Sequence, residues 1–310
     1  MNDRPSPATS IGVVAAGDTE PGADGDRSRG GERPANAAGT DRSAGAVADA
    51  VAAIEGAGGV AETGRPDTVV AATPDAIVAV GESACCGLVA AGVAAPVLPV
   101  EVGGVASVAR ADVPTAAERL VAGDYRVREH PVVRASSRGI DGRAWMDVTL
   151  TTAETASISE YAVRSPLPSA ARTRATTDDG GPSDRADPDG GDDPAGSPEE
   201  FVVRVRADGV VAATPIGSRG YARAAGGPVI VPGSGVGAVV PIAPFATDTE
   251  SWVLPLDELV LSVERDGVPV EVLADDRPLG TVEPGTAVRL APDGALELAL
   301  VPESRPAGAQ

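Results

Sequence analysis

The sequence contains no lysine, so all 25 of its basic residues are arginines, and they stand against 45 acidic residues for a formal net charge of −20. A chain of this charge lacks the basic face that nucleic-acid binding requires, so we expect no nucleic-acid partner. Aromatic residues make up only 2% of the chain, which also excludes a stacking platform for single strands. The acidic, lysine-free composition resembles that of proteins from extreme halophiles, whose charged surfaces stay hydrated in concentrated salt.

Cysteine and histidine are nearly absent as well. Cys85 and Cys86 are adjacent and His130 is the only histidine, so no set of residues has the spacing of a zinc site. We expect the two cysteines to pack as small buried hydrophobes, and His130 to be a surface residue on a strand.

Long apolar runs are absent too. None approaches the roughly 18 residues of a membrane span, and the N-terminus lacks the basic and apolar segments of a secretory signal. The sequence therefore predicts a cytoplasmic protein without membrane contact.

Strand-like and helix-like segments alternate in residues 11–123, which predicts an α/β domain with an open parallel sheet. The segment from Ala76 to Val80 is apolar on both faces, as a central parallel strand should be. Residues 1–10 and 19–43 have no apolar period and are predicted to be flexible. The other predicted strands are 11–17, 68–71 and 96–100, and the predicted helices are 46–55, a short one within 81–92, and 115–122.

After Gly123 the pattern changes to short alternating segments, which predicts an all-β domain over residues 124–303, β-sandwich-like in form. An acidic low-complexity stretch, about 166–199, is predicted to be a disordered insertion, and 304–310 a flexible tail. The predicted strands are 125–135, 145–152, 157–164, 201–206, 210–213, 229–231, 239–241, 259–263, 270–273, 287–290 and 296–301.

The stretch from Asp208 to Pro228 carries the most information. Its dense glycines allow backbone N–H groups to approach a ligand, and Tyr221 offers a flat face to a base. The stretch resembles the signature of the NAD kinase family, in which Asp-Gly opens a strand that leads into Thr-Pro-Thr-Gly-Ser-Thr-Ala-Tyr and then Ala-Gly-Gly-Pro. The residues that match are Asp208-Gly209, Thr214-Pro215, Gly217-Ser218, Tyr221 and Ala225-Gly226-Gly227-Pro228, whereas Ile216, Arg219 and Gly220 depart from the pattern.

The resemblance, which extends from about Ile77 to about Leu290, implies nucleotide-binding roles for this stretch, including Thr214, Gly217 and Ser218. Asp208 stands where the family contacts the nicotinamide amide, and Tyr221 where it lines the adenine pocket. Arg219 either clashes with the family's adenine pose or pairs with a phosphate.

A second segment resembles the family's catalytic motif, Gly-Gly-Asp-Gly-Thr after a buried strand. Here Gly81 keeps the first glycine, Glu82 replaces the second, and Ser83 occupies the position of the catalytic aspartate. A serine is not ionised at neutral pH and cannot act as a carboxylate base, and loss of a general base costs about 10²–10⁴-fold in rate. Glu82 is a possible substitute, but we expect the purified protein to make little NADP.

Two further positions follow from the resemblance. Ser159-Glu160 stands where the family has an Asn-Glu pair that holds ribose hydroxyls; Glu160 is kept, and the alternative is an ordinary glutamate on an acidic surface. Asp275 echoes a family Asp-Gly turn and is either a site residue or simply part of a hairpin.

The resemblance implies an NAD kinase-like protein that phosphorylates NAD to NADP with ATP and Mg²⁺ and assembles as a homo-oligomer. The alternative is a catalytically degenerate paralogue that binds NAD, NADP or a related nucleotide as a sensor or partner subunit.

Overall fold

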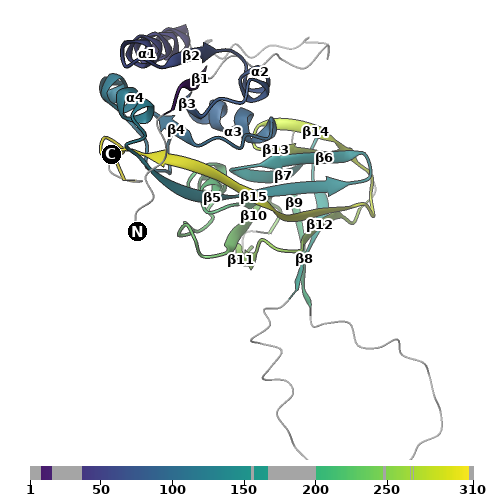
Figure 1. The fold of residues 1–310 in the computed structure, drawn as a ribbon. Helices are drawn as coiled ribbons and strands as arrows, with labels where there is room; N and C mark the ends of the chain where they lie inside the picture. The colour runs from purple at the N-terminus through teal and green to yellow at the C-terminus, as the bar shows by residue number, and fades with distance from the viewer. Residues whose placement is uncertain are drawn as a thin grey trace, which may run out of the picture.

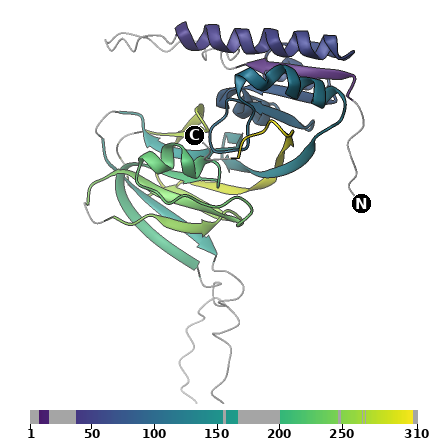
Figure 2. The same cartoon turned by 90° about the vertical axis from the view of Figure 1, so that its left-hand side faces the viewer.

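The computed structural model describes residues 8–15, 37–154, 157–166, 200–246, 249–265, 267 and 269–306. An N-terminal α/β layer lies above a larger β-rich part (Figures 1 and 2). The stretches predicted to be a flexible N-terminus, an acidic insertion and a flexible tail lie largely outside the described residues.

Four parallel strands form the N-terminal part of the sheet in the order β2-β1-β3-β4, which confirms the predicted α/β domain. All five residues of β3 are buried, as expected of a central strand. Helices α1 and α4 cover the outer face, while α2 and α3 lie between this sheet and the β-rich part (Figure 1). The strands are β1 (Ser10–Ala15), β2 (Val60–Thr63), β3 (Ala76–Val80) and β4 (Val97–Val100); the helices are α1 (Ala37–Gly56), α2 (Pro66–Ala71), α3 (Glu82–Ala90) and α4 (Val113–Val121).

Two predictions in this domain were wrong. The segment 68–71, assigned to a strand because of its β-branched residues, belongs to helix α2, which Pro66 begins. Val69 is buried there against β1, where its side chain fills the space beside Gly12, so tertiary packing overrides local propensity. Helix α1 starts at Ala37, so the last residues of the predicted flexible stretch 19–43 are helical.

The C-terminal part is mainly antiparallel, as predicted, and encloses its own apolar core. Its strands are β5 (Arg126–Ser137), β6 (Ile140–Ala144), β7 (Asp147–Thr152), β8 (Ser159–Pro166), β9 (Glu200–Ala213), β10 (Val236–Pro244), β11 (Trp252–Pro255), β12 (Leu259–Val263), β13 (Val270–Ala274), β14 (Arg277–Val282) and β15 (Ala287–Leu300), with the short helices η2 (Gly217–Arg219) and α6 (Tyr221–Ala224); a further short helix, η1 (Arg110–Asp112), directly precedes α4 in the N-terminal part.

Strand β15 joins the two parts into one sheet. It pairs with β5 along most of its length, and Leu298 is the partner of Val97 in β4. The predicted strands 287–290 and 296–301 are therefore one strand, irregular between Pro292 and Ala295. Likewise 201–206 and 210–213 are both parts of β9, whereas 229–231 is not a strand.

His130 was predicted to be at the surface, but it is only 4% exposed on β5, opposite Leu296 of β15. Burial, with the nearby Arg128, lowers the pKa of its imidazole to about 4, so it is neutral at physiological pH. The prediction was wrong because the N-terminal layer covers β5 over part of its length. The alternation of apolar residues within β5 does not reveal this cover.

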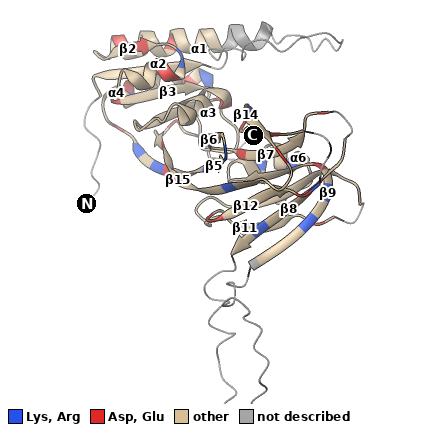
Figure 3. Ribbon diagram, turned by 90° about the vertical axis from the view of Figure 1, so that its right-hand side faces the viewer, with Lys and Arg blue, Asp and Glu red and all other residues tan. Residues whose placement is uncertain are grey.

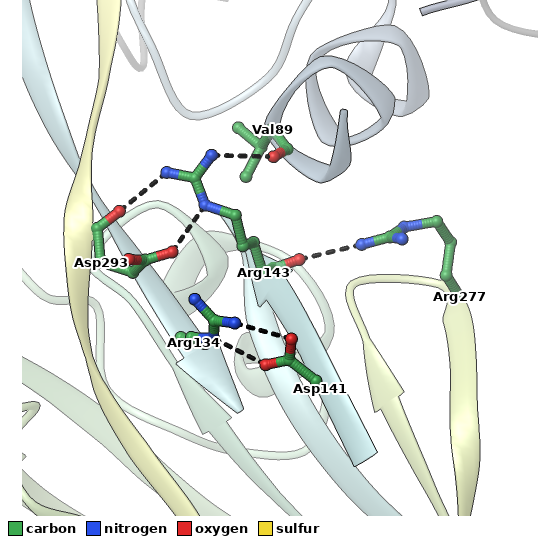
Figure 4. Close-up of polar contacts among 6 residues, drawn as sticks. All are labelled: Val89, Arg134, Asp141, Arg143, Arg277 and Asp293. Carbon is green, nitrogen blue, oxygen red and sulfur yellow. Dashed lines mark hydrogen bonds and ion pairs between the residues drawn. The ribbon is translucent and has the colours of Figure 1, made fainter. Parts of the chain in front are cut away.

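Helix α3 is held against the β-rich part at its C-terminal end (Figure 4). The Arg143 guanidinium on β6 donates to the carbonyl of Val89 at 3.3 Å and to the carbonyl of Asp293 at 2.8 Å, and it pairs with the Asp293 carboxylate at 2.8 Å. Arg277 on β14 donates to the Arg143 carbonyl at 2.9 Å. One arginine thus ties a helix of the α/β layer to two strands beneath it.

Candidate functional site

A cavity of about 380 Å³ lies between the start of α3 and the β-rich part. Its walls come from four places in the sequence: the first turns of α3, strand β7, the start of α6, and the turn between β13 and β14. The lining residues are Glu82, Ser83 and Cys86; Met146, Asp147, Thr149 and Thr151; Gly220 and Tyr221; and Leu273, Asp275 and Asp276.

The α3 wall depends on Gly81, which caps the helix with φ = 88°, a left-handed conformation that favours glycine. Its N–H donates to the carbonyl of Val100 at 2.9 Å, which fixes the turn to β4. The sharp turn places Glu82 and Ser83 at the start of the helix, where both are exposed. The segment that resembles the catalytic motif therefore has a sharp glycine turn, with Ser83 where the resemblance implies an aspartate.

The hairpin wall is built around Asp275, whose φ of 58° is unusual for a residue other than glycine. Its carboxylate accepts the backbone N–H groups of Trp145, Met146 and Asp147 at 2.7–3.2 Å, and its own N–H donates to the Asp147 carbonyl at 2.8 Å. These bonds stabilise the turn and fix the start of β7 beside it. Asp275 is thus both part of a hairpin turn and a cavity residue.

Asp147 is the most deeply buried carboxyl group of the cavity, with 6% of the residue exposed. Desolvation and the neighbouring Asp275 raise its pKa from 3.8 to about 7, although the Thr149 hydroxyl opposes the shift by donating to its Oδ1 at 3.1 Å. Although Glu82 is exposed to solvent, partial desolvation and the charges of Asp275 and Asp276 also raise its pKa. The cavity therefore contains a carboxyl group that gains and loses its proton near neutral pH.

The two cysteines are buried, as predicted. Burial raises the pKa of Cys85 to about 12 and that of Cys86 further, so both are protonated thiols rather than nucleophiles. Cys86 lies against the cavity, where its thiol hydrogen-bonds to Asp275.

Most residues of the glycine-rich stretch between Thr214 and Ser218 have a structural role. The buried Thr214 hydroxyl donates to the carbonyl of Trp145 at 2.6 Å, and the Ser218 hydroxyl donates to the carbonyl of Pro215 and accepts the N–H of Ile230. A Cβ on Gly217 would lie 1.9 Å from the Met146 carbonyl oxygen, so only glycine fits this contact. These residues do not line the cavity; they position the backbone that leads to Tyr221.

Tyr221 lies at the mouth of the cavity, where the residue is 50% exposed. Burial and the charges of Asp147 and Asp208 raise the pKa of its phenol, so both carboxylates are within electrostatic reach. The backbone of Asp208 is fixed, because its carbonyl accepts the hydroxyls of Tyr161 at 3.1 Å and Thr152 at 3.2 Å.

The remaining predicted residues lie outside the cavity lining. Ser159 is buried and pairs with Ala207 in β9, next to Asp208. The Glu160 carboxylate pairs with Arg206 of β9 at 3.3 Å. Strand β9 carries blue arginine segments in Figure 3. Arg219 points away toward the loop after β4, where its side chain lies close to Gly104.

Sequence reasoning missed Asp147, Thr149 and Thr151. The alternation within 145–152 correctly predicted a strand, and these three residues share one of its faces because they are two positions apart. Which face meets a cavity depends on α3 lying over it, and that contact is not encoded locally.

No group of three or more His, Cys, Asp or Glu side chains in the described ranges is arranged to hold a metal ion. These residues thus do not by themselves form a site for the Mg²⁺ implied by the resemblance. Within the same ranges, no helix combines the length and apolar character needed to cross a bilayer.

Comparison with known proteins places the sequence similarity in the C-terminal half. The family model described as the ATP-NAD kinase C-terminal domain matches residues 195–291. NAD kinase of Methanosarcina acetivorans is 38% identical over 91 residues, 29% of this chain and 33% of that protein, and NAD kinase of Methanosarcina barkeri is 55% identical over 53 residues, 17% and 19% of the two chains. The match with the M. acetivorans protein thus spans about a third of its length.

Similarity of fold extends over nearly the whole chain. An NAD kinase from Archaeoglobus fulgidus, solved in complex with ATP, superposes with a TM-score of 0.63 at 18% identity and covers 94% of this chain and 93% of its own. Yeast NADH kinase, solved with NADH, gives 0.63 at 14% identity over 96% and 85% of the two chains. The C-terminal sequence match is thus to the NAD kinase family, and the chain has the two-part fold of the NAD kinases with which it superposes.

Proposed function

We propose that this protein binds NAD in the cavity beside α3 and phosphorylates its ribose with ATP to give NADP. The observation that carries the proposal is the convergence of Ser83, Tyr221 and Asp275 on one cavity. They come from three segments far apart in the sequence, and each segment was singled out by its resemblance to a motif of the family. Structural neighbours solved with ATP and with NADH support nucleotides as the ligands.

The cavity also has the form expected of such a site. Its volume of about 380 Å³ is within the range of small-molecule pockets, about 300–1,000 Å³, and large enough for part of a dinucleotide. Tyr221 offers a half-exposed ring, whereas the Asp147 carboxyl and Thr149 hydroxyl groups of the lining are buried. This order suits a base stacked at the surface and a ribose held inside.

A second function, binding without catalysis, is favoured by two observations. Ser83 supplies no carboxylate at the motif position, and none of the residues lining the cavity is an arginine that could offset phosphate charge. A family member of this kind would act as a dinucleotide sensor or partner subunit. The homo-oligomer and the magnesium requirement implied by the resemblance stay predictions in either case.

Calorimetry in molar KCl with NAD, NADP and ATP, run beside an assay for NADP formation, separates the two functions. Tyr221→Ala should weaken NAD binding by about 1–3 kcal/mol, the typical value for a base stacked on an aromatic ring. Phe245→Ala is the matched control, because Phe245 is 71% exposed and lies outside the cavity. Asp208→Ala should weaken NAD more than ATP, since only NAD carries a carboxamide.

Binding of NAD together with NADP formation supports the kinase, and binding alone supports the sensor. If none of the three nucleotides binds with a dissociation constant below the millimolar range, both functions are wrong.

A further inference from the structure

The four carboxyl groups of the cavity are not equivalent. The Asp275 carboxylate already accepts hydrogen bonds from three backbone N–H groups. Asp276 is exposed at the hairpin turn. Glu82 is exposed at the first turn of α3. Asp147 is the remaining one: it is buried, it lines the cavity, and within the described residues its carboxylate has a single hydrogen-bond donor, the Thr149 hydroxyl on Oδ1.

Asp147 shares the lining of the cavity with the start of α3, the hairpin turn and Tyr221. The charges of Asp275, Glu82 and Asp276 all raise its pKa, and its own charge raises the pKa of Tyr221. Asp147 therefore lies within reach of the start of α3, which carries Ser83, of the hairpin turn, and of the tyrosine at the mouth. A ribose bound below Tyr221 and beside Ser83 would place a hydroxyl group near this carboxylate.

We infer that Asp147, and not the residue at the motif position, is the carboxylate that accepts the ribose proton during phosphoryl transfer. The inference rests on the proposed kinase function and deepens it, because it assigns the base that the serine at position 83 cannot supply. Strand β7 would thus provide the catalytic group that the turn before α3 has lost.

The step is a simple displacement. The ribose hydroxyl oxygen forms a bond to the terminal phosphorus of ATP, and the bond between that phosphorus and the bridging oxygen breaks, with the electron pair leaving on ADP. The hydroxyl proton passes to the Asp147 carboxylate and then to water, so the products are NADP, ADP and a proton. Thr149 orients the carboxylate by donating to Oδ1, and no side chain or backbone group of the described residues donates to Oδ2.

The buried position also suits the chemistry of a base. A general base works best when its pKa is near the working pH, and the pKa of Asp147 is about 7. The titratable groups that face it are Glu82 on α3, Asp275 and Asp276 on the hairpin turn, and Tyr221 on α6. All of them except Tyr221 are carboxyl groups, so their charges raise its pKa together.

The test is NADP formation from NAD and ATP between about pH 5.5 and 8.5 in molar KCl, for the wild-type protein, Asp147→Asn, Glu82→Gln and Asp141→Asn. The wild-type rate should rise with pH and level off above about pH 7. Asp147→Asn should lower kcat by about 10²–10⁴-fold and abolish the rise, while the KM for NAD stays near its wild-type value. Asp141→Asn is the control: Asp141 is exposed on β6 and pairs with Arg134 at 2.6 Å, outside the cavity.

Thr149→Val provides a second variant that keeps the carboxylate. Because the Thr149 hydroxyl lowers the pKa of Asp147, its removal should move the midpoint of the pH profile upward. Calorimetry with NAD and a melting curve on each variant show that the fold and the ligand site are intact, and Thr149→Val decides the case if Asp147→Asn does not fold.

The possible failures are distinguishable. If the wild type forms NADP and Asp147→Asn is within about twofold of it with the pH midpoint unchanged, the role of Asp147 is refuted and the kinase stands. The role of Asp147 is also refuted if Glu82→Gln, and not Asp147→Asn, shows the expected fall in kcat, since Glu82 is then the base. If the wild type binds NAD and forms no NADP at any pH, the kinase function itself fails, and the assignment of Asp147 with it.

Discussion

Asp147→Asn should stabilise the folded protein, and increasingly so as the pH rises. In the unfolded chain the pKa of this carboxyl group is close to its ordinary value of 3.8, whereas burial and Asp275 raise it to about 7 in the native state. Ionising Asp147 is therefore unfavourable in the folded protein, and the cost grows as the pH rises from about 4 to 7 and is constant above that. Below pH 4 the group is protonated in both states and contributes nothing.

The size of the effect follows from the shift. A difference of about three pKa units corresponds to about 4 kcal/mol in the free energy of unfolding at pH 8, of which about 1.5 kcal/mol is already present at pH 5. Asn has nearly the same shape, keeps the hydrogen bond from Thr149 and carries no charge. Between pH 5 and pH 8 the advantage of the variant over the wild type should thus grow by about 2–3 kcal/mol.

Urea unfolding of both proteins at pH 5 and pH 8, in the same molar KCl, measures this difference. Asp141→Asn is again the control, because Arg134 lowers the pKa of that exposed carboxyl group and no gain at pH 8 is expected. If the advantage of Asp147→Asn is the same at both pH values, or if the variant is less stable at pH 8, Asp147 is not a desolvated carboxyl group and the reasoning about the base is wrong as well.

Two further predictions concern the fold. With a net charge of −20 and no lysine, the protein should melt at a lower temperature in dilute buffer than in molar KCl, since salt screens the repulsion; equal melting temperatures would contradict this. Gly217→Ala should destabilise the fold by about 1–3 kcal/mol or more, because its Cβ would overlap the Met146 carbonyl at 1.9 Å. Gly56→Ala, with no atom within 4 Å of the new Cβ, should leave the urea midpoint unchanged or raise it slightly, and equal losses in both variants would refute the packing argument.

The fold class could be predicted from the sequence because its signals are local. The uniformly apolar β3 and the helix that follows it showed a parallel α/β layer, and the alternation after Gly123 showed an all-β part. Errors arose where distant packing outweighs propensity. The segment 68–71 is helical because Val69 packs against β1, and His130 is buried because another layer covers it.

For the site, the sequence alone determined the family motifs and therefore the segments that meet: the turn at Gly81, the stretch ending at Tyr221, and Asp275. Through the resemblance it also predicted that Ser83 stands at the position of the motif aspartate. Only the tertiary structure decided which carboxyl group is buried beside them. A pKa near 7 at Asp147 arises from desolvation by burial and from charges on α3 and the β13–β14 turn, and neither cause is visible in the residues around position 147.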